Sequence, residues 1–148
     1  MTITIRQASP GDEPAIVDLV QEFASAIDEQ SPADQHYVRR YLVSPNTTIL
    51  LASDARDVVG MLSYSTRPGL FRAGDSGEIE ILVVSAHRRG EGIGKRLLRT
   101  GMRLMQDAGC VEISVSVGAD NETAQALYFD TGLTNASIRL EKRCRRST

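Results

Sequence analysis

The stretch Arg88-Arg89-Gly90-Glu91-Gly92-Ile93-Gly94-Lys95 decides the fold of this 148-residue chain. It follows an apolar run at 78–84, which predicts a strand, and precedes an amphipathic segment at 94–108, which predicts a helix. Glycines at alternate positions let the backbone turn tightly and approach a ligand closely. The N–H groups of such a turn and the positive end of the helix dipole favour a phosphate, and Arg89 and Lys95 add charge. We therefore predict a phosphate-binding strand–turn–helix unit, with a plain tight turn before a solvated basic helix as the alternative.

Two other phosphate-binding motifs match this stretch less well. A Walker A loop needs Gly, four residues, and then Gly-Lys-Ser/Thr. Here Gly94-Lys95 is followed by Arg96, and the opening position holds Arg89. The dinucleotide fingerprint Gly-x-Gly-x-x-Gly is one residue longer than the glycine spacing from Gly90 to Gly94. A nucleotide-binding fragment of this second type stays open as an alternative, with Asp120 as its acidic residue.

Apolar periodicity and turn residues predict a mixed α/β order for the rest of the chain. The expected strands are 2–6, 47–52, 58–65, 78–84, 111–117 and 137–142; the expected helices are 14–29, 37–43, 94–108 and 121–131. The stretch 67–77 contains a Pro and several Gly residues and is predicted to be a loop. No repeat or linker-like segment divides the chain, so we expect residues 1–148 to form a single domain.

Composition excludes several classes of protein. The chain is 41% hydrophobic and 24% charged, as in ordinary soluble domains. Its 17 Lys and Arg against 19 Asp and Glu give a net charge of −2, which argues against nucleic acid or an anionic membrane as a partner. No apolar run is long enough to cross a bilayer, no leader-like segment is visible, and the two cysteines are too few for a disulfide framework, so we expect a cytoplasmic protein. Two histidines and two distant cysteines offer no metal-ligand spacing, and no metal is expected.

Two blocks of the sequence resemble the GNAT superfamily of acetyl-CoA-dependent N-acetyltransferases. The block 84–98 is similar to the family's pyrophosphate-binding segment, with Arg89-x-x-Gly92-x-Gly94 matching its Arg/Gln-x-x-Gly-x-Gly/Ala core. The block 121–133 is similar to the family's Asn-x-x-Ala-x-x-Leu-Tyr-x-x-x-Gly-Phe pattern, with Leu133 in place of Phe. The resemblance implies a mixed, bent sheet flanked by helices, with acetyl-CoA bound between two splayed strands.

The same resemblance implies which residues bind acetyl-CoA. The backbone of the strand before the turn would pair with the pantetheine arm, and the turn would hold the pyrophosphate. Asn121 would contact acetyl-CoA from the start of the last helix, although a plain helix N-cap is an equally good interpretation. The implied set is Leu82, Val83, Val84, Arg89, Gly90, Glu91, Gly92, Ile93, Gly94, Lys95, Asn121 and Tyr128.

Two residues are candidates for the proton transfers of acetyl transfer. Tyr128 matches the family's acid tyrosine, and a phenol is a donor at neutral pH; the alternative is an amphipathic Tyr packed in the core. Glu80 lies on the strand that enters the cofactor cleft, and strand alternation predicts that it shares a face with Leu82 and Val84. Glu80 is therefore the candidate base, with Glu78 or water as alternatives.

The resemblance implies an N-acetyltransferase that moves an acetyl group from acetyl-CoA to a primary amine of a small molecule, peptide or protein. The amine would attack the thioester directly in a ternary complex. The alternative is a non-catalytic acyl-CoA-binding regulatory module on the same scaffold. Because little chain follows the segment 137–142, we expect a homodimer in which a partner subunit completes the acceptor cleft.

Overall fold

The computed structural model of the protein describes residues 2–146, which fall into two compact units that meet in sequence between Val115 and Ser116. The first unit contains β1 (Thr4–Gln7), α1 (Glu13–Ala26), α2 (Gln35–Val43), β2 (Thr47–Ser53), β3 (Val58–Gly69), β4 (Gly74–Val84), the short 3-10 helix η1 (Ala86–Arg88), α3 (Ile93–Asp107) and β5 (Cys110–Val115). The second unit contains α4 (Glu122–Asp130). The predicted mixed α/β order is confirmed for every element except the last strand.

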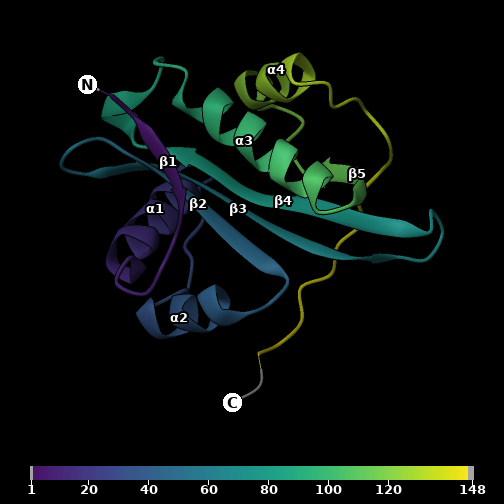
Figure 1. Ribbon diagram of the computed structural model, residues 1–148, viewed down its shortest axis with the longest axis horizontal. Coiled ribbons are helices and arrows are strands. Elements are labelled where there is room, and N and C mark those ends of the chain that lie inside the picture. The colour runs from purple at the N-terminus through teal and green to yellow at the C-terminus, as the bar shows by residue number, and fades with distance from the viewer. Residues whose placement is uncertain (1, 147–148) are drawn as a thin grey trace. The chain divides into compact units, whose positions relative to one another are not determined.

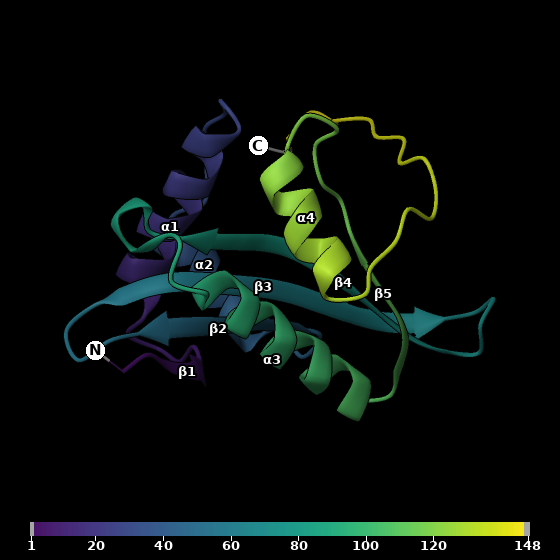
Figure 2. The same ribbon diagram turned by 90° about the horizontal axis from the view of Figure 1, so that it is seen from above.

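The strands of the first unit form one sheet in the order β1-β2-β3-β4-β5. Neighbours from β1 to β4 are antiparallel, whereas β5 pairs with β4 in parallel. In Figures 1 and 2, α1 and α2 lie on one face of this sheet and α3 lies across the other face. The parallel pair is possible because α3 carries the chain back along the sheet between β4 and β5.

Each face of the sheet has its own apolar layer. On the face of α1 and α2, side chains of the helices pack with alternate residues of the strands. This layer consists of Ile16, Leu19, Val38, Ile49, Leu51, Met61 and Val83. On the other face, α3 buries Leu97, Leu98 and Met105. Gly101 lets α3 lie close to β3, since a side chain at this position would collide with Leu62.

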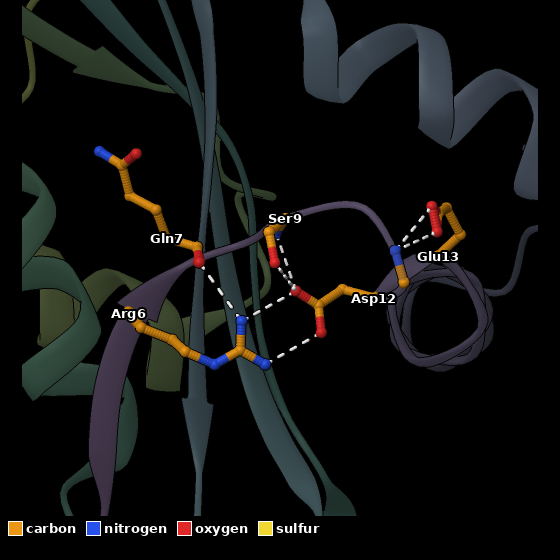
Figure 3. A network of polar contacts seen from close by, with 6 residues as sticks. Arg6, Gln7, Ser9, Asp12 and Glu13 are labelled. Atoms are coloured by element: carbon orange, nitrogen blue, oxygen red, sulfur yellow. Dashed lines mark hydrogen bonds and ion pairs between the residues drawn. The ribbon is translucent and has the colours of Figure 1, made fainter.

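A bidentate ion pair joins β1 to the start of α1 (Figure 3). The Arg6 guanidinium donates from Nη1 and Nη2 to the two carboxylate oxygens of Asp12 at 2.8 and 2.9 Å. The backbone N–H of Ser9 donates to the same carboxylate at 2.8 Å. Asp12 occupies the N-cap position of α1, but its carboxylate makes these bonds and does not cap the helix. The hydrogen bonds, above all those from Arg6, lower the pKa of Asp12 from 3.8 to about 2.

The stretch 67–77 is not the loop that we predicted. β3 and β4 stay paired as far as Gly69 and Gly74, and residues 70–73 make the turn between them. At Gly77 a side chain would collide with Met105 of α3. The prediction was wrong because glycine usually indicates a turn, whereas here it marks a position where a neighbouring element approaches the strand backbone.

The strand predicted at 137–142 is also absent from the described part of the second unit. Residues 133–146 have no regular secondary structure, and Ile138 and Leu140 are exposed. An alternating pattern indicates which side chains share a face, but a strand also needs a partner for its backbone groups. Within residues 116–146 the one regular element is a helix, which offers no such partner.

The Arg6–Asp12 pair makes stability depend on acid pH. Because the folded state lowers the pKa of Asp12, the stabilisation is complete above about pH 4 and is lost as the pH falls toward 2. We expect Asp12→Asn to lower the free energy of unfolding by about 0.5–1 kcal/mol at pH 7. Urea titrations from pH 7 to pH 2.5 should show this difference shrinking below pH 4. Asp18→Asn, at an exposed position of α1, is the control, and a difference that does not depend on pH would contradict the assignment.

Candidate functional site

One edge of β4 is open along its second half. β5 pairs with β4 from Asp75↔Cys110 to Ile79↔Val115 and ends there. β3 continues to pair with the other edge of β4 as far as Val84. Within residues 2–115, the segment 80–84 therefore has a strand partner on one side only. Unpaired strand edges readily accept an extended ligand as an added strand.

The backbone groups of this segment alternate in direction. The N–H of Ser85 donates to the carbonyl oxygen of Val59 in β3 at 2.8 Å. In an antiparallel pair, every second residue turns its N–H and carbonyl toward the partner strand. Val83 therefore faces β3, while Leu82 and Val84 direct their backbone groups to the open edge. Of the three strand residues predicted to bind acetyl-CoA, the geometry favours Leu82 and Val84 and disfavours Val83.

A β-bulge lies at the start of the open segment. Ser63 of β3 is opposite Ile81, and the following residue, Tyr64, is opposite Ile79, so Glu80 is an extra residue in β4. Glu80 thus occupies the first position beyond the pairing of β5. Its side chain is exposed to solvent.

The bulge also changes the face to which Glu80 belongs. Leu82 is opposite Leu62, whose side chain lies beside Gly101 of α3. The Glu80 carboxylate instead lies on the other face, 3.4 Å from the hydroxyl of Tyr41 in α2. The prediction that Glu80 shares a face with Leu82 and Val84 was wrong, because the extra residue interrupts the alternation of the strand. Glu78 lies before the bulge, where β4 has strand partners on both sides.

The glycine-rich turn lies between β4 and α3, as predicted, and begins with the short helix η1. Gly90 and Gly92 have φ angles of 81° and 80°, in the left-handed region that favours glycine. The first backbone hydrogen bond of α3 runs from the N–H of Arg96 to the carbonyl of Gly92 at 3.1 Å. Because Gly92 has no side chain to cap the helix, the N–H groups of Ile93 and Gly94 have no acceptor within the helix. The start of α3 can therefore bind an anion.

Arg88 holds this turn against the rest of the sheet. Its Nη1 donates to Asp54 at 2.6 Å and its Nε donates to Glu91 at 2.9 Å. Asp54 belongs to the turn between β2 and β3, where it also accepts the backbone N–H groups of Asp57 and Arg56. These two N–H groups, together with Arg88, lower the pKa of Asp54 to about 2. The Glu91 carboxylate, which accepts from both Nε and Nη2 of Arg88, thus helps to hold the turn in shape.

Arg89, in contrast, lies at the open edge. Its Nε donates to the carbonyl oxygen of Val84 at 3.1 Å, and that carbonyl points away from β3. The side chain is exposed, and its terminal N–H groups have the fork geometry that suits a phosphate. Lys95 is half-buried in the first turn of α3. The open edge, Arg89 and the start of α3 thus follow one another along the chain, and the Arg89–Val84 bond joins the first two.

Asn121 and Tyr128 belong to the second unit, which is described by itself. The side-chain oxygen of Asn121 accepts the backbone N–H of Ala124 at 3.2 Å, so the N-cap interpretation is confirmed. Tyr128 lies in α4 and is buried, and this burial raises the pKa of its phenol above the ordinary value. The phenol is therefore a proton donor throughout the neutral range.

Sequence reasoning missed the residues that hold the site in shape. Besides Asp54, these include Glu22 of α1, whose carboxylate accepts the backbone N–H of Ala86 at 2.8 Å. Tyr41 and Ser63, which lie beside the bulge, were missed as well. The Glu22–Ala86 bond joins residues 64 positions apart, and the Arg88–Asp54 pair joins residues 34 apart. No short-range pattern in the sequence indicates such contacts.

Comparisons with known proteins agree with this geometry. The model of the acetyltransferase (GNAT) family matches residues 14–132. An aminoalkylphosphonate N-acetyltransferase from Salmonella typhimurium strain LT2 is 29% identical over 139 residues, covering 93% of this chain and 89% of that protein. A mycothiol acetyltransferase from Amycolatopsis mediterranei is 27% identical over 139 residues, covering 89% of this chain but 46% of that protein. These relatives support acetyl transfer as the general reaction.

A solved structure supports the fold. The crystal structure of aminoglycoside acetyltransferase HMB0005, from an uncultured soil metagenomic sample, matches with a TM-score of 0.83. The two sequences are 22% identical, and the match covers 98% of this chain and 100% of that chain. At this identity the match speaks for the fold alone. The predicted fold, a mixed sheet flanked by helices as in acetyltransferases, is confirmed.

Two further properties concern the described residues as a whole. In residues 2–146 we find no helix with the length and apolar character needed to cross a membrane. In the same part of the chain, His, Cys, Asp and Glu side chains nowhere gather in threes or more around a point that could hold a metal ion.

The Asp54–Arg88 pair should control the order of the glycine-rich turn. In Asp54→Asn, one carboxamide oxygen can still accept backbone N–H groups, but an NH2 group would face Arg88. We expect amide hydrogen exchange of residues 89–92 to become about fivefold faster, because the turn opens more readily once Arg88 has lost this acceptor. Asp57→Asn in the same turn is the control, because the backbone of Asp57, and not its carboxylate, bonds Asp54. Equal exchange rates in the two variants would show that Arg88 does not order the turn.

Proposed function

Because the chain belongs to the acetyltransferase (GNAT) family, we propose that it is an acetyl-CoA-dependent N-acetyltransferase that acts on a primary amine. One observation carries this proposal: the open edge of β4 leads from Glu80 past Val84 to Arg89 and the start of α3. A carboxylate, an open strand edge and a candidate anion site thus follow one another from residue 80 to residue 94. This order corresponds to an acceptor amine, an extended thioester arm and a diphosphate.

The residues of the first unit fit acetyl-CoA, which supplies the acetyl group as a thioester. Leu82 and Val84 would bond the amide groups of its extended arm, as an added strand does. Arg89 and the N–H groups of Ile93 and Gly94 would bind the diphosphate. The double pairing of Arg88 keeps that side chain out of this role.

Glu80 is the base that we propose for the acceptor amine. An amine attacks a thioester only in its neutral form, so a carboxylate or a water molecule must remove its proton. The exposed carboxylate of Glu80 stands beside the first residues of the open edge. Glu78 is a weaker candidate, since it lies in the part of β4 that is paired on both sides.

Tyr128 is the acid that we propose for the leaving thiolate. As the new C–N bond forms and the C–S bond breaks, the sulfur gains negative charge and must be protonated. The pKa of Tyr128 is raised by burial, so the phenol keeps its proton at neutral pH and can donate it. The family resemblance of the 121–133 block supports the same role.

The acceptor is a primary amine of a small molecule, peptide or protein. The Salmonella relative, matched over most of both chains, is named for aminoalkylphosphonates. This name makes a small aminoalkyl compound the first acceptor to test.

An amine panel with thiol detection tests the proposal. Acetyl-CoA should bind in calorimetry, and coenzyme A thiol should be released only when a suitable amine is added. Tyr128→Phe should lower kcat by roughly 10- to 100-fold and leave acetyl-CoA affinity nearly unchanged, because it removes only the acid. Binding without turnover for any small-molecule, peptide or protein amine would favour a non-catalytic acyl-CoA-binding regulatory module. Lack of binding would refute both functions.

Arg89 should carry much of the affinity for the diphosphate. We expect Arg89→Ala to weaken acetyl-CoA binding about tenfold, since a charge-assisted hydrogen bond contributes about 1.5–3 kcal/mol, less where it is exposed. Arg99→Ala, at an exposed position later in α3, is the matched control and should bind normally. The measurement is calorimetry at fixed ionic strength. Equal losses in both variants would indicate general electrostatic attraction instead of a site.

A further inference from the structure

We propose that Tyr41 is a positioning residue for Glu80, holding the carboxylate of the base in place at the bulge of β4. The inference rests on the proposed function and adds to it a residue from a different element, α2. No motif in the sequence includes Tyr41. The contact exists because the bulge turns Glu80 toward the face that α2 covers.

The central contact is a long hydrogen bond. The hydroxyl of Tyr41 donates to Oε1 of Glu80 at 3.4 Å. An exposed glutamate side chain samples many rotamers, and placing it costs conformational entropy. A donor on a packed helix reduces that freedom before a substrate arrives. Bonds of this kind are often long in the free enzyme and shorten when the substrate binds.

Tyr41 itself is well anchored. Its ring is half-buried and packs against the apolar layer between α1, α2 and the sheet. Its backbone carbonyl accepts a hydrogen bond from Oγ1 of Thr47, the first residue of β2, at 2.6 Å. The position of the hydroxyl is therefore set by the core and not by a mobile loop.

Ser63 of β3 bonds the backbone beside the bulge. Its buried Oγ accepts the N–H of Ile81, the residue after Glu80, at 3.2 Å. The Tyr41 hydroxyl has one hydrogen, which it donates to Glu80. Hydrogen bonds to two other elements, β3 and α2, thus hold both the backbone of the bulge and the carboxylate that it carries.

The groups around Tyr41 keep its hydroxyl protonated. Burial and the negative charge of Glu80 from β4 raise its pKa well above the ordinary value, with a smaller contribution from Tyr37 of its own helix. Ser63 from β3 acts in the opposite direction and does not cancel these effects. Tyr41 is therefore a donor, and not a competing base, across the pH range in which acetyl transfer takes place.

A double-mutant cycle on the whole protein tests the role. We expect Tyr41→Phe, which keeps the ring and its packing, to lower kcat for the best amine roughly tenfold with the KM for acetyl-CoA unchanged. Glu80→Gln should lower kcat roughly 100-fold. The double variant should be no slower than Glu80→Gln alone, because Tyr41 acts through the carboxylate. Tyr37→Phe, which removes an exposed hydroxyl from the same helix, should leave kcat unchanged.

Several kinetic results would overturn the role. If the losses of the two single variants multiply in the double variant, Tyr41 acts independently of Glu80. If Tyr41→Phe retains the kcat of an active wild-type protein, Tyr41 has no positioning role while the proposed function stands. If the wild-type protein transfers no acetyl group to any amine, the proposed function fails and this role fails with it.

Discussion

β4 has strand neighbours on both sides up to Ile79, and beyond that residue it is paired with β3 alone. A backbone N–H or carbonyl needs a hydrogen-bond partner. The unpaired groups of an open strand edge can therefore pair with an extended ligand. The rest of the site follows from this constraint. The bulge at Glu80 marks where the open segment begins, and Arg89 and the turn before α3 lie where it ends. Acetyl-CoA, with amide groups in the middle and a diphosphate at one end, is the ligand that we propose for this arrangement.

In the glycine-rich turn, two neighbouring arginines have different partners and therefore different roles. Two consecutive arginines have the same charge and nearly the same place in the chain. Arg88 is held between Asp54 and Glu91, so its charge is neutralised and it stiffens the turn. Arg89 donates to the carbonyl of Val84, which carries no net charge and does not neutralise the guanidinium. A chain with a net charge of −2 can therefore present a cationic site, because position and pairing matter more than the sum of charges.

Local sequence patterns predicted the helices and strands well, but they predicted poorly which elements pack or pair with one another. The apolar run at 78–84, the glycine spacing and the periodicity of 94–108 are short-range signals, and the strand–turn–helix unit that they predicted is present. The stretch 67–77 was misjudged because Gly74 and Gly77 accommodate the side chains of Val111 and Met105, which lie far away in sequence. The face of Glu80 was misjudged because a bulge depends on the pairing with β3 and leaves no mark in the strand's own residues.

The sequence by itself determined the mixed α/β order, the glycine-rich turn between β4 and α3, and the membership of an acetyltransferase family, since each rests on residue types at fixed spacing. The tertiary structure alone decided which charges remain available and which groups surround Glu80. The pairing of Arg88 with Asp54 and the approach of Tyr41 to Glu80 join residues 34 and 39 positions apart. Such contacts depend on how helices pack on the sheet and on strand register, and neither is encoded in any single stretch of the chain.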